Sequence, residues 1–341
     1  MTKLPIEPGQ AFEQLPKVEL HYHLDGGLRP STVRALATEA DIPLPKDEEQ
    51  FLQLIQVQDS CNSLTSYLEK FQLPISLMQT AANLERIAFE AVEDAANTNV
   101  KYIEIRFAPQ LHVEQGLTLE AIVTAVLKGM QRGEAQCGTI SRLILICLRN
   151  HPVSMNEQVL ELAKMFYRKG VVGIDLAGDE AGYPAILHKS VFEAAHLAGI
   201  PITIHAGEAA GADSIRDAIF ALHAQRIGHG VRLEQNQDLL SHVRESQTTL
   251  EMCFSSNIQT KAAADRSLHP IRRYYDEGIA VTVNTDNATV SNTTLNLEYG
   301  RLANNFGFEP RDFMKMNTLA IKASFVEDEI KAALLRNHFA E

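Results

Sequence analysis

Two of the twelve histidines, His21 and His23, are separated by a single residue in a short apolar stretch that runs from Lys17 to Asp25. Side chains on a β-strand alternate between its two faces, so both imidazoles are expected on the same face. Imidazole nitrogens bind borderline divalent cations such as Zn²⁺ at about 2.0–2.1 Å. A His-x-His pair also occurs as a plain polar stripe on a half-buried strand. The pair therefore predicts a metal site only if further ligands join it.

Further residues with the same chemistry follow at intervals along the chain. His205 begins a His-Ala-Gly-Glu segment that ends with Glu208, and His229 lies between two glycines. Asp286 lies in an Asn-Thr-Asp-Asn segment. Each segment comes at the end of a short run of strand-forming residues. Whether these side chains meet therefore depends on how the strands are arranged.

Eight strand-forming runs alternate with helical segments. The first run ends at the His-x-His pair, and the others are expected over 100–107, 140–147, 171–176, 200–205, 226–229, 249–253 and 279–285. The clearest helical periodicity covers 84–95. Further helices are expected to start at Thr118, as a cap, and to cover 154–169, 185–198, 212–224, 238–245 and 270–277. Ser154 and the glutamate three residues later have the spacing of a capping box.

Strands that each precede a helix are typical of a parallel (β/α)8 barrel of the TIM type. An open doubly wound sheet gives the same alternation, but its first strand is normally followed by a G-x-G-x-x-G turn, which this chain lacks. We therefore expect an α/β barrel with a helical insertion over 29–99 after the first strand. Extra helices are expected at the C-terminal end over 294–305, 311–324 and 327–338. In such a barrel all strand ends converge on one catalytic face.

Three histidines and one aspartate on that face suit a single divalent cation with one position left for water. A bound Zn²⁺ lowers the pKa of its water to about 7, so that hydroxide is available at neutral pH. The fourth expected strand carries Asp175 but no lysine, so nothing there suggests a carboxylated lysine that bridges two metal ions. Glu208 is not needed as a ligand, and a carboxylic acid beside a metal hydroxide is a good proton shuttle.

The composition limits the possible partners. The chain has 341 residues, 45% of them hydrophobic, and 31 Lys and Arg residues against 43 Asp and Glu residues give a formal net charge of −12. This balance argues against binding to nucleic acid or to an anionic membrane. The four cysteines form no C-x-x-C pair, as is usual for reduced thiols in a cytoplasmic protein. Residues 1–10 lack a signal-peptide pattern and no linker interrupts the chain, so one domain over 1–341 is expected.

Five segments, in this order, resemble the motifs of the adenosine deaminase family, a branch of the amidohydrolase superfamily. They lie at residues 17–26, 175–180, 205–208, 228–230 and 284–286. The resemblance extends over about residues 15–325, which is nearly the whole chain. It implies hydrolytic deamination of adenosine and 2′-deoxyadenosine to inosine and 2′-deoxyinosine, with release of ammonia, in purine salvage.

The same resemblance implies how a metal ion and a ribose are held. A single Zn²⁺ per chain would be bound by His21, His23, His205 and Asp286. His23, together with Asp25, would also contact a ribose hydroxyl group. The unrelated zinc deaminases of the cytidine type use an H-x-E segment together with P-C-x-x-C, which this chain does not contain.

The resemblance further implies contacts to the purine ring. Glu208 would protonate N1, His229 would deprotonate or orient the attacking water, and Gly178 would contact N3. Many family members carry a second aspartate after the metal-binding one, where it reaches the purine N7, and this chain has Asn287 there. Because an amide carries N–H donors at every pH, we expect Asn287 to donate to N7.

Two other functions stay open. The same chemistry acting on free adenine, or on an adenosine modified at its 5′ position, would depend on the insertion over 29–99. A metal-binding barrel without catalysis is disfavoured, because Glu208 and His229 are both present and neither is needed to hold the metal.

Asp179 and Glu180 are interpreted as solvated loop charges, and the segment 255–257 either as a loop turn or as part of the active face. The sequence gives no indication of the oligomeric state.

Overall fold

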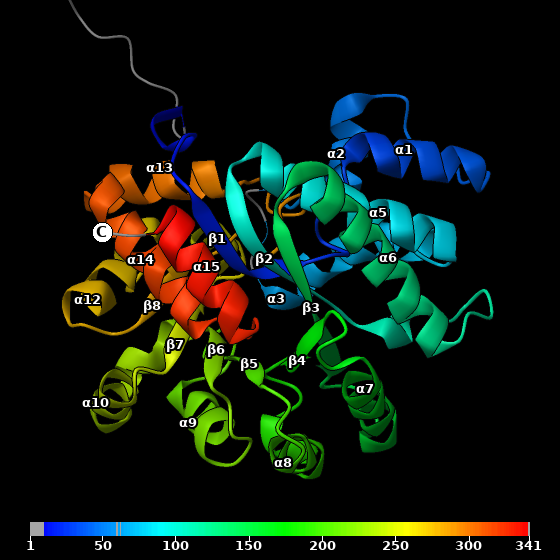
Figure 1. Ribbon diagram of the computed structural model, residues 1–341. Helices are drawn as coiled ribbons and strands as arrows, with labels where there is room; N and C mark the ends of the chain where they lie inside the picture. The colour runs from blue at the N-terminus through cyan, green and yellow to red at the C-terminus, as the bar shows by residue number, and fades with distance from the viewer. Residues whose placement is uncertain (1–9, 59–60, 62, 340–341) are drawn as a thin grey trace, which may run out of the picture.

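The computed structural model describes residues 10–58, 61 and 63–339, in which eight parallel strands occur (Figure 1). Their bounds are β1 Lys17–His23, β2 Val100–Phe107, β3 Ile140–Leu148, β4 Val171–Ala177, β5 Thr203–Ala206, β6 Arg226–His229, β7 Thr249–Met252 and β8 Val281–Val283. They pair in chain order as two sheets, β1 to β4 and β5 to β8. Isolated parallel bridges Ile174–Ile202 and Tyr22–Asp286 join the two sheets at both seams. The predicted (β/α)8 barrel is thereby confirmed.

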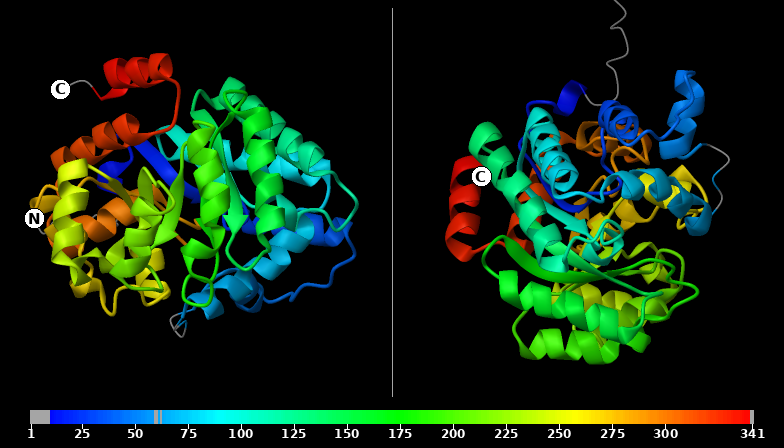
Figure 2. Two further views of the ribbon diagram at one scale, coloured as in Figure 1. Left: turned by 90° about the horizontal axis from the view of Figure 1, so that it is seen from below. Right: turned by 90° about the vertical axis from the view of Figure 1, so that its right-hand side faces the viewer.

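Helices surround the strands on the outside (Figures 1 and 2). Those between β2 and β8 are α6 Leu119–Cys137, α7 Val153–Phe166, α8 Lys189–Leu197, α9 Ala212–Phe220, α10 Gln237–Ser246, α11 Phe254–Gln259 and α12 Ile271–Asp276. The chain ends with α13 Leu295–Phe306, α14 Pro310–Ala323 and α15 Asp328–His338. Among the described residues, no helix has the length and apolar character needed to cross a bilayer. Residues 1–9, where no signal-peptide pattern is expected, lie outside the described ranges.

The insertion after β1 is helical, as predicted. It contains α1 Pro30–Glu39, α2 Glu48–Ile55, α3 Leu64–Leu68, α4 Gln72–Leu77 and α5 Ala81–Asn97. The apolar positions of α5, among them Leu84, Ile87 and Val92, are buried. At the start of α6, the Thr118 hydroxyl accepts a hydrogen bond from the backbone N–H of Ala121 at 3.2 Å, so the predicted cap is confirmed.

Some predicted element ends are wrong. The fifth strand begins at Thr203 and not at residue 200, because Pro201 has no N–H to donate to a sheet ladder. The eighth strand is also shorter than predicted, with only three residues. The segment that follows it turns toward the barrel mouth and pairs with β1 through Asp286 alone.

The capping box predicted at Ser154 is also wrong. Helix α7 starts one residue earlier, after Pro152, and has no side-chain cap. The Asn156 side chain, which a capping box would leave free, binds the backbone N–H and C=O of Leu148 at 3.0 and 2.9 Å. A tertiary contact with the end of β3 thus replaces the local cap that the spacing predicted.

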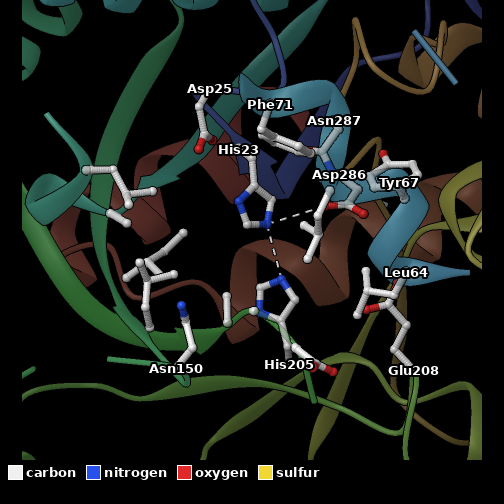
Figure 3. Close-up of a pocket in the computed structure, with 18 of the residues that line it drawn as sticks. His23, Asp25, Leu64, Tyr67, Phe71, Asn150, His205, Glu208, Asp286 and Asn287 are labelled. Carbon is white, nitrogen blue, oxygen red and sulfur yellow. Dashed lines mark hydrogen bonds and ion pairs between the residues drawn. The ribbon is translucent and has the colours of Figure 1, made fainter. Parts of the chain in front are cut away.

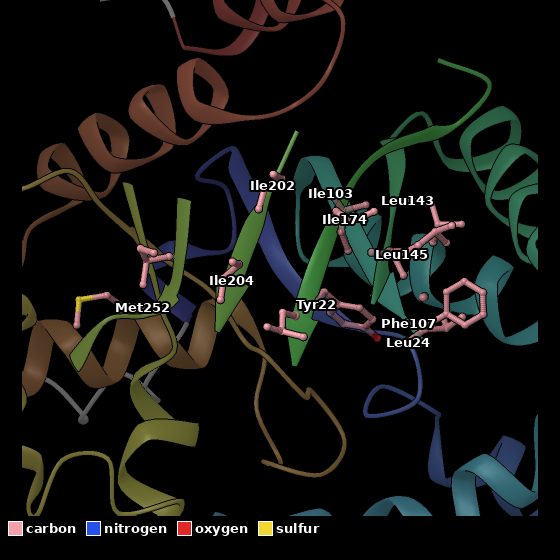
Figure 4. Close-up of a cluster of buried hydrophobic side chains, with 14 of the residues drawn as sticks. Tyr22, Leu24, Ile103, Phe107, Leu143, Leu145, Ile174, Ile202, Ile204 and Met252 are labelled. Carbon is pink, nitrogen blue, oxygen red and sulfur yellow. The ribbon is translucent and has the colours of Figure 1, made fainter. Parts of the chain in front are cut away.

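Apolar side chains on the outer faces of the strands form the main core with the surrounding helices (Figure 4). Strand β2 shows the alternation clearly, since Ile103, Ile105 and Phe107 all belong to this layer and are at most 1% exposed. This layer fixes which face of each strand points outward. The residues between them must therefore point into the barrel.

The barrel interior is charged. Arg106 of β2 donates hydrogen bonds to Asp175 of β4 at 2.9 Å and to Glu251 of β7 at 2.8 Å. Arg226 of β6 pairs with Glu251 and with Glu104. All five side chains are at most 1% exposed. Barrels of this type more often fill their interior with branched apolar side chains, so this network is a specialised feature of the chain.

The last two helices cover the end of the barrel where the strands begin. Val18 of β1 and Tyr102 of β2 are buried together with Ile321 of α14 and Leu334 of α15. In the left view of Figure 2, α15 and α3 lie at opposite ends of the molecule. The end of the barrel where the strands finish is therefore left for the insertion to cover.

The contact between α5 and α6 gives a test of this packing. A Cβ atom added at Gly129 would lie 2.1 Å from the backbone carbonyl oxygen of Glu85. Glycine-to-alanine changes within helices normally stabilise by about 1 kcal/mol, but overpacking of this kind costs about 1–3 kcal/mol. Gly129→Ala should therefore lower the midpoint of thermal unfolding, whereas Thr124→Ala on the exposed side of α6 should leave it nearly unchanged. A raised midpoint for Gly129→Ala in differential scanning fluorimetry would contradict the contact.

Candidate metal centre and catalytic site

The ends of the strands bring together side chains that lie far apart in the sequence. His21 and His23 come from β1, His205 from β5, His229 from β6, and Asp286 from the segment after β8. All except His23 are buried, and the His23 side chain is 12% exposed. Figure 3 shows His23, His205 and Asp286 pointing toward one another at the edge of a cavity. The predicted convergence on one face of the barrel is thus observed.

Carboxylates inside the barrel orient two of these histidines. His21 Nδ1 lies 2.9 Å from Glu251 Oε2, and His205 Nδ1 lies 3.0 Å from Asp175 Oδ2. An ionised carboxylate only accepts hydrogen bonds, so each Nδ1 carries a proton and each Nε2 keeps its lone pair. His21 Nε2 is buried and has no hydrogen-bond partner. These lone pairs have the orientation that a bound metal ion requires.

The ligand atoms have the spacing of one coordination shell. His23 Nε2 lies 3.1 Å from His205 Nε2 and 3.4 Å from Asp286 Oδ1. His21 Nε2 also lies 3.4 Å from Asp286 Oδ1. Four ligands at about 2.0–2.1 Å from a tetrahedral ion are about 3.3–3.4 Å apart. A second combination, whose atoms all lie within 4.8 Å of one another, consists of His21, His205, His229 and Asp286. The site thus offers three histidines and one aspartate, with two candidates for the third histidine.

His229 and Asp286 adopt a backbone conformation that residues other than glycine rarely adopt. The φ angle is 64° at both positions. At each one, the N–H of the following residue donates a hydrogen bond to the C=O of the preceding residue, which makes a tight three-residue turn. Such a conformation costs about 1–3 kcal/mol and is found mainly at functional sites. The sequence motifs gave no indication of this strain.

Glu208 lies beside the cluster with a shifted pKa. Burial raises the pKa of its carboxyl group to about 7, and the nearby Asp286 carboxylate adds to the rise. Its Oε2 atom lies 3.6 Å from His229 Nε2. Burial lowers the pKa of His229 to about 4, so this imidazole is neutral at pH 7. A carboxyl group whose pKa lies near the working pH is well suited to general acid–base catalysis.

Glu180 holds the turn that carries Glu208, and its interpretation as a solvated loop charge is wrong. The side chain is buried, with 3% exposed. Its two oxygens accept hydrogen bonds at 2.6–3.0 Å from the consecutive backbone N–H groups of residues 207–210. The neighbouring Asp179 is only half-buried and accepts a hydrogen bond from Gly182 within its own loop. Glu180 thus acts as the anion in a nest of backbone donors.

A cavity of about 370 Å³ lies next to the cluster (Figure 3). The predicted substrate contacts Asp25, Gly178 and Asn287 all line it. Burial raises the pKa of Asp25 to about 7, and its Oδ1 is buried without a hydrogen-bond partner, as is Oδ1 of Asn287. The insertion adds an apolar wall that includes Leu64, Tyr67, Leu68, Phe71 and Ile75. The cavity therefore combines unsatisfied polar atoms on one side with apolar surface on the other.

The segment 255–257, at the start of α11, belongs to the site and is more than a loop turn. Ser256 Oγ donates a hydrogen bond to Asp286 Oδ2 at 2.6 Å, and Asn257 Nδ2 lies 2.9 Å from His229 Nδ1. Both side chains are fully buried. Their position directly after β7, on the face where the strand ends converge, is the sequence signal for this role.

Comparison with known proteins identifies relatives over nearly the whole chain. A family model described as adenosine deaminase matches residues 16–339. A protein named adenosine deaminase from Clostridium acetobutylicum is 45% identical over 323 residues, which are 94% of this chain and 96% of that protein. The sequence likeness therefore extends well beyond the short motifs around the metal centre.

Solved structures have the same architecture. An adenine deaminase from Arthrobacter aurescens superposes with a TM-score of 0.87 and 28% identity, and the match covers 94% of this chain and 97% of that one. An amidohydrolase from Burkhoderia ambifaria with bound Zn gives a TM-score of 0.86 and 25% identity, and the match covers 98% and 93% of the two chains. Deaminases and a zinc-containing amidohydrolase thus share this barrel.

Glu180→Gln tests whether the carboxylate holds the catalytic turn. An amide keeps one acceptor oxygen but turns N–H donors toward other N–H groups, so part of the nest is left unsatisfied. Each such loss costs about 1–3 kcal/mol, so the midpoint of thermal unfolding and kcat should both fall. Glu234→Gln, which removes only a surface ion pair with Arg273, should change neither measurement appreciably. Wild-type stability in Glu180→Gln would contradict the role of the nest.

Proposed function

This chain belongs to the adenosine deaminase family, and on that premise we propose that it catalyses the hydrolytic deamination of adenosine and 2′-deoxyadenosine. The oxygen of water forms a bond to C6 of the purine, the bond to the exocyclic amine breaks, and ammonia leaves with inosine or 2′-deoxyinosine. The observation that carries this proposal is the Glu208 carboxyl group, with a pKa of about 7, in the same cavity as the three-histidine, one-aspartate site. The reaction needs both an activated water and a proton for the ring.

We propose that one Zn²⁺ per chain is held by His21, His23, His205 and Asp286. The spacing of these ligand atoms and the orphaned Nε2 of His21 support this set. In the described part of the chain, the group of such side chains whose ligand atoms all lie within 4.8 Å of one another consists of His21, His205, His229 and Asp286, so it shares three of the four proposed ligands and has His229 in place of His23. When bound, such an ion lowers the pKa of a coordinated water to about 7 and so supplies hydroxide at neutral pH.

The buried charges around the site also suit a divalent cation. Two buried guanidinium groups, Arg106 and Arg226, face a larger number of buried carboxylates. These are Glu104, Asp175, Glu251 and Asp286. These six groups leave two negative charges, and the buried Arg149 and Glu180 beside them add one charge of each sign, so the excess stays at two. Because uncompensated buried charge is strongly unfavourable, a dication at the centre balances the region.

The protein side chains then divide the proton transfers. Protonated Glu208 donates its proton to N1 of the purine, which makes C6 a better target for water. His229, whose Nε2 lies 3.6 Å from Glu208, faces the same region and contacts the attacking water. The Glu180 nest keeps the Glu208 turn fixed while this transfer takes place.

The cavity side chains provide the contacts to the nucleoside. Asp25, with an unpartnered buried oxygen, and His23 are proposed to bind a ribose hydroxyl group. Gly178 is proposed to approach N3, which its φ of 107° allows without a side chain in the way. Asn287 is proposed to donate to N7. The position of Asp25 in the cavity favours a nucleoside over free adenine, which has no ribose to bind.

We further propose that residues 1–341 work as one hydrolase domain in the cytoplasm. Cys61, Cys137, Cys147 and Cys253 are unpaired. Free thiols of this kind are typical of proteins in reducing compartments. The acidic balance of the chain, with a formal net charge of −12, fits a small-molecule substrate and not a nucleic acid.

Purified protein should release ammonia from adenosine and 2′-deoxyadenosine, and Glu208→Gln should abolish most of this turnover. An amide has no acidic proton to give to N1, and general acid–base steps contribute about 10²–10⁴-fold. The measurements are the absorbance change on deamination, ammonia release and zinc content, and the zinc content should stay unchanged. Glu161→Gln, a change at an exposed ion pair with Lys164, serves as the matched control. Turnover of adenine alone, with no reaction on either nucleoside, would contradict the proposal that adenosine and 2′-deoxyadenosine are the substrates.

Metal analysis of single variants separates ligands from neighbours. His205→Ala and His23→Ala should each lose zinc and activity, because a site with one ligand fewer binds the ion more weakly. His229→Ala should keep zinc while losing turnover, and His196→Ala, on the surface of α8, should change neither. Inductively coupled plasma mass spectrometry after gel filtration gives the zinc content. Zinc loss in His229→Ala together with retention in His23→Ala would instead put His229 in the ligand set.

A further inference from the structure

The side of His229 that faces away from the cavity is connected to a chain of buried hydrogen bonds. Its Nδ1 lies 2.9 Å from Asn257 Nδ2, and Asn257 Oδ1 lies 3.1 Å from His269 Nε2. His269 Nδ1 in turn lies 3.3 Å from the backbone nitrogen of Ile271. All three side chains are at most 3% exposed. This series of contacts, from Ile271 through His269 and Asn257 to His229, is called the relay below.

The orientation of the Asn257 amide is set by a backbone donor. The N–H of Cys253 points at Asn257 Oδ1 at a distance of 3.3 Å. A backbone N–H only donates, so the atom that faces it must be the amide oxygen. A flipped amide would place two donors against each other. Asn257 Nδ2 is therefore the atom that faces His229.

A second backbone donor gives the same orientation independently. The N–H of Ile271 donates to His269 Nδ1, so that nitrogen carries the lone pair of the ring. The proton of a neutral His269 is then on Nε2, where it donates to Asn257 Oδ1. Burial lowers the pKa of His269 to about 3, so the ring stays neutral. Both ends of the relay thus require an amide oxygen toward His269 and an amide N–H toward His229.

We propose that Asn257, supported by His269, is a positioning residue that holds His229 as the neutral tautomer protonated on Nε2. Asn257 Nδ2 donates to His229 Nδ1, so Nδ1 must be the acceptor and the ring proton must lie on Nε2. That proton points into the cavity toward Glu208 Oε2. The tautomer follows from the fixed directions of two backbone N–H groups, that of Cys253 at Asn257 and that of Ile271 at His269.

This assignment separates His229 from the proposed metal ligands. The Nδ1 atoms of His21 and His205 face carboxylates, so their Nε2 atoms keep lone pairs that a metal can accept. His229 has the opposite arrangement, because its Nδ1 faces an amide donor. An Nε2–H has no lone pair with which to bind a metal ion. His229 is therefore a neighbour of the metal centre, and His23 is the third histidine ligand.

The tautomer also determines the role of His229 in catalysis, and this role rests on the deaminase function proposed above. A ring whose Nε2 already carries a proton, and whose Nδ1 is occupied by Asn257, has no free basic nitrogen to take a proton from water. Its Nε2–H instead donates a hydrogen bond to the oxygen of the attacking water. That bond orients the oxygen toward C6 and leaves the proton transfers to Glu208, which gives its proton to N1 and, once ionised, takes a proton from the water and passes it to the leaving amine.

Nuclear magnetic resonance of the zinc-loaded protein labelled with ¹⁵N-histidine tests the tautomer directly. The shifts of the two ring nitrogens distinguish a protonated nitrogen from one with a lone pair, and the His229 signals are those missing from His229→Gln. We expect a protonated Nε2 and an unprotonated Nδ1 in the wild-type protein. A protonated Nδ1 on His229 would overturn the proposal. This reading needs no turnover, so an inactive protein with the expected tautomer would reject the function and leave the relay intact.

Asn257→Asp tests whether the relay causes the tautomer. A carboxylate at this position only accepts, so it should draw the ring proton to Nδ1 and leave Nε2 without a donor. Loss of one such donor is expected to lower kcat about 10²-fold or more, with a much smaller change in KM. Asn236→Asp, at the N-cap of α10 where either side chain can cap, is the matched control. An unchanged His229 tautomer with wild-type kcat in a folded Asn257→Asp would overturn the proposal.

His269→Phe gives a second test at the far end of the relay. It removes the donor to Asn257 Oδ1 while keeping a ring that packs on Phe254. The amide is then held by Cys253 alone, so we expect part of the His229 signal to shift toward the other tautomer and kcat to fall by less than in Asn257→Asp. If the His229 signals and kcat were both those of the wild type, His269 would have no part in the relay.

Discussion

The site depends on the position of Arg106 inside the barrel. Its guanidinium group bridges Asp175 and Glu251, and these two carboxylates orient the rings of His205 and His21. Burial alone would raise the pKa of Glu251, but Arg106 and Arg226 hold it well below its ordinary value. A protonated carboxyl group would no longer be a pure acceptor for the histidine Nδ1–H. One buried cation therefore sets the direction of two lone pairs at the metal centre.

Charged side chains inside the barrel orient the histidine rings, but they take the place of apolar side chains that would pack there. Buried ion pairs contribute little net stability, because desolvation offsets most of their attraction. The apolar layer outside the strands and the cap formed by α14 and α15 supply the burial that the interior lacks. The interior network is thus best understood as part of the site.

The sequence predicted the features that depend on the chain's own periodicity. The alternation of strands and helices predicted the barrel. Because the carboxyl ends of its strands converge on one face, it also predicted that His205 and Asp286 lie close together. It failed for Glu180, whose partners are backbone N–H groups of residues 207–210 on another strand end. The capping box at Ser154 failed for a related reason, since a contact between Asn156 and the end of β3 replaced the local one. Residue type and spacing do not encode partners that only the closed barrel supplies.

The histidines show most clearly why spacing alone does not assign chemistry. His205 and His229 each lie near the end of a strand, and a glycine follows each of them within two residues. What differs is the group behind the ring, a carboxylate in one case and the Asn257 amide in the other. An acceptor behind the ring leaves a lone pair toward the cavity, whereas a donor leaves a proton there. The proposed roles of the two histidines, a metal ligand for His205 and a hydrogen-bond donor for His229, therefore follow from the side chains that lie behind the rings and not from the histidines' own positions.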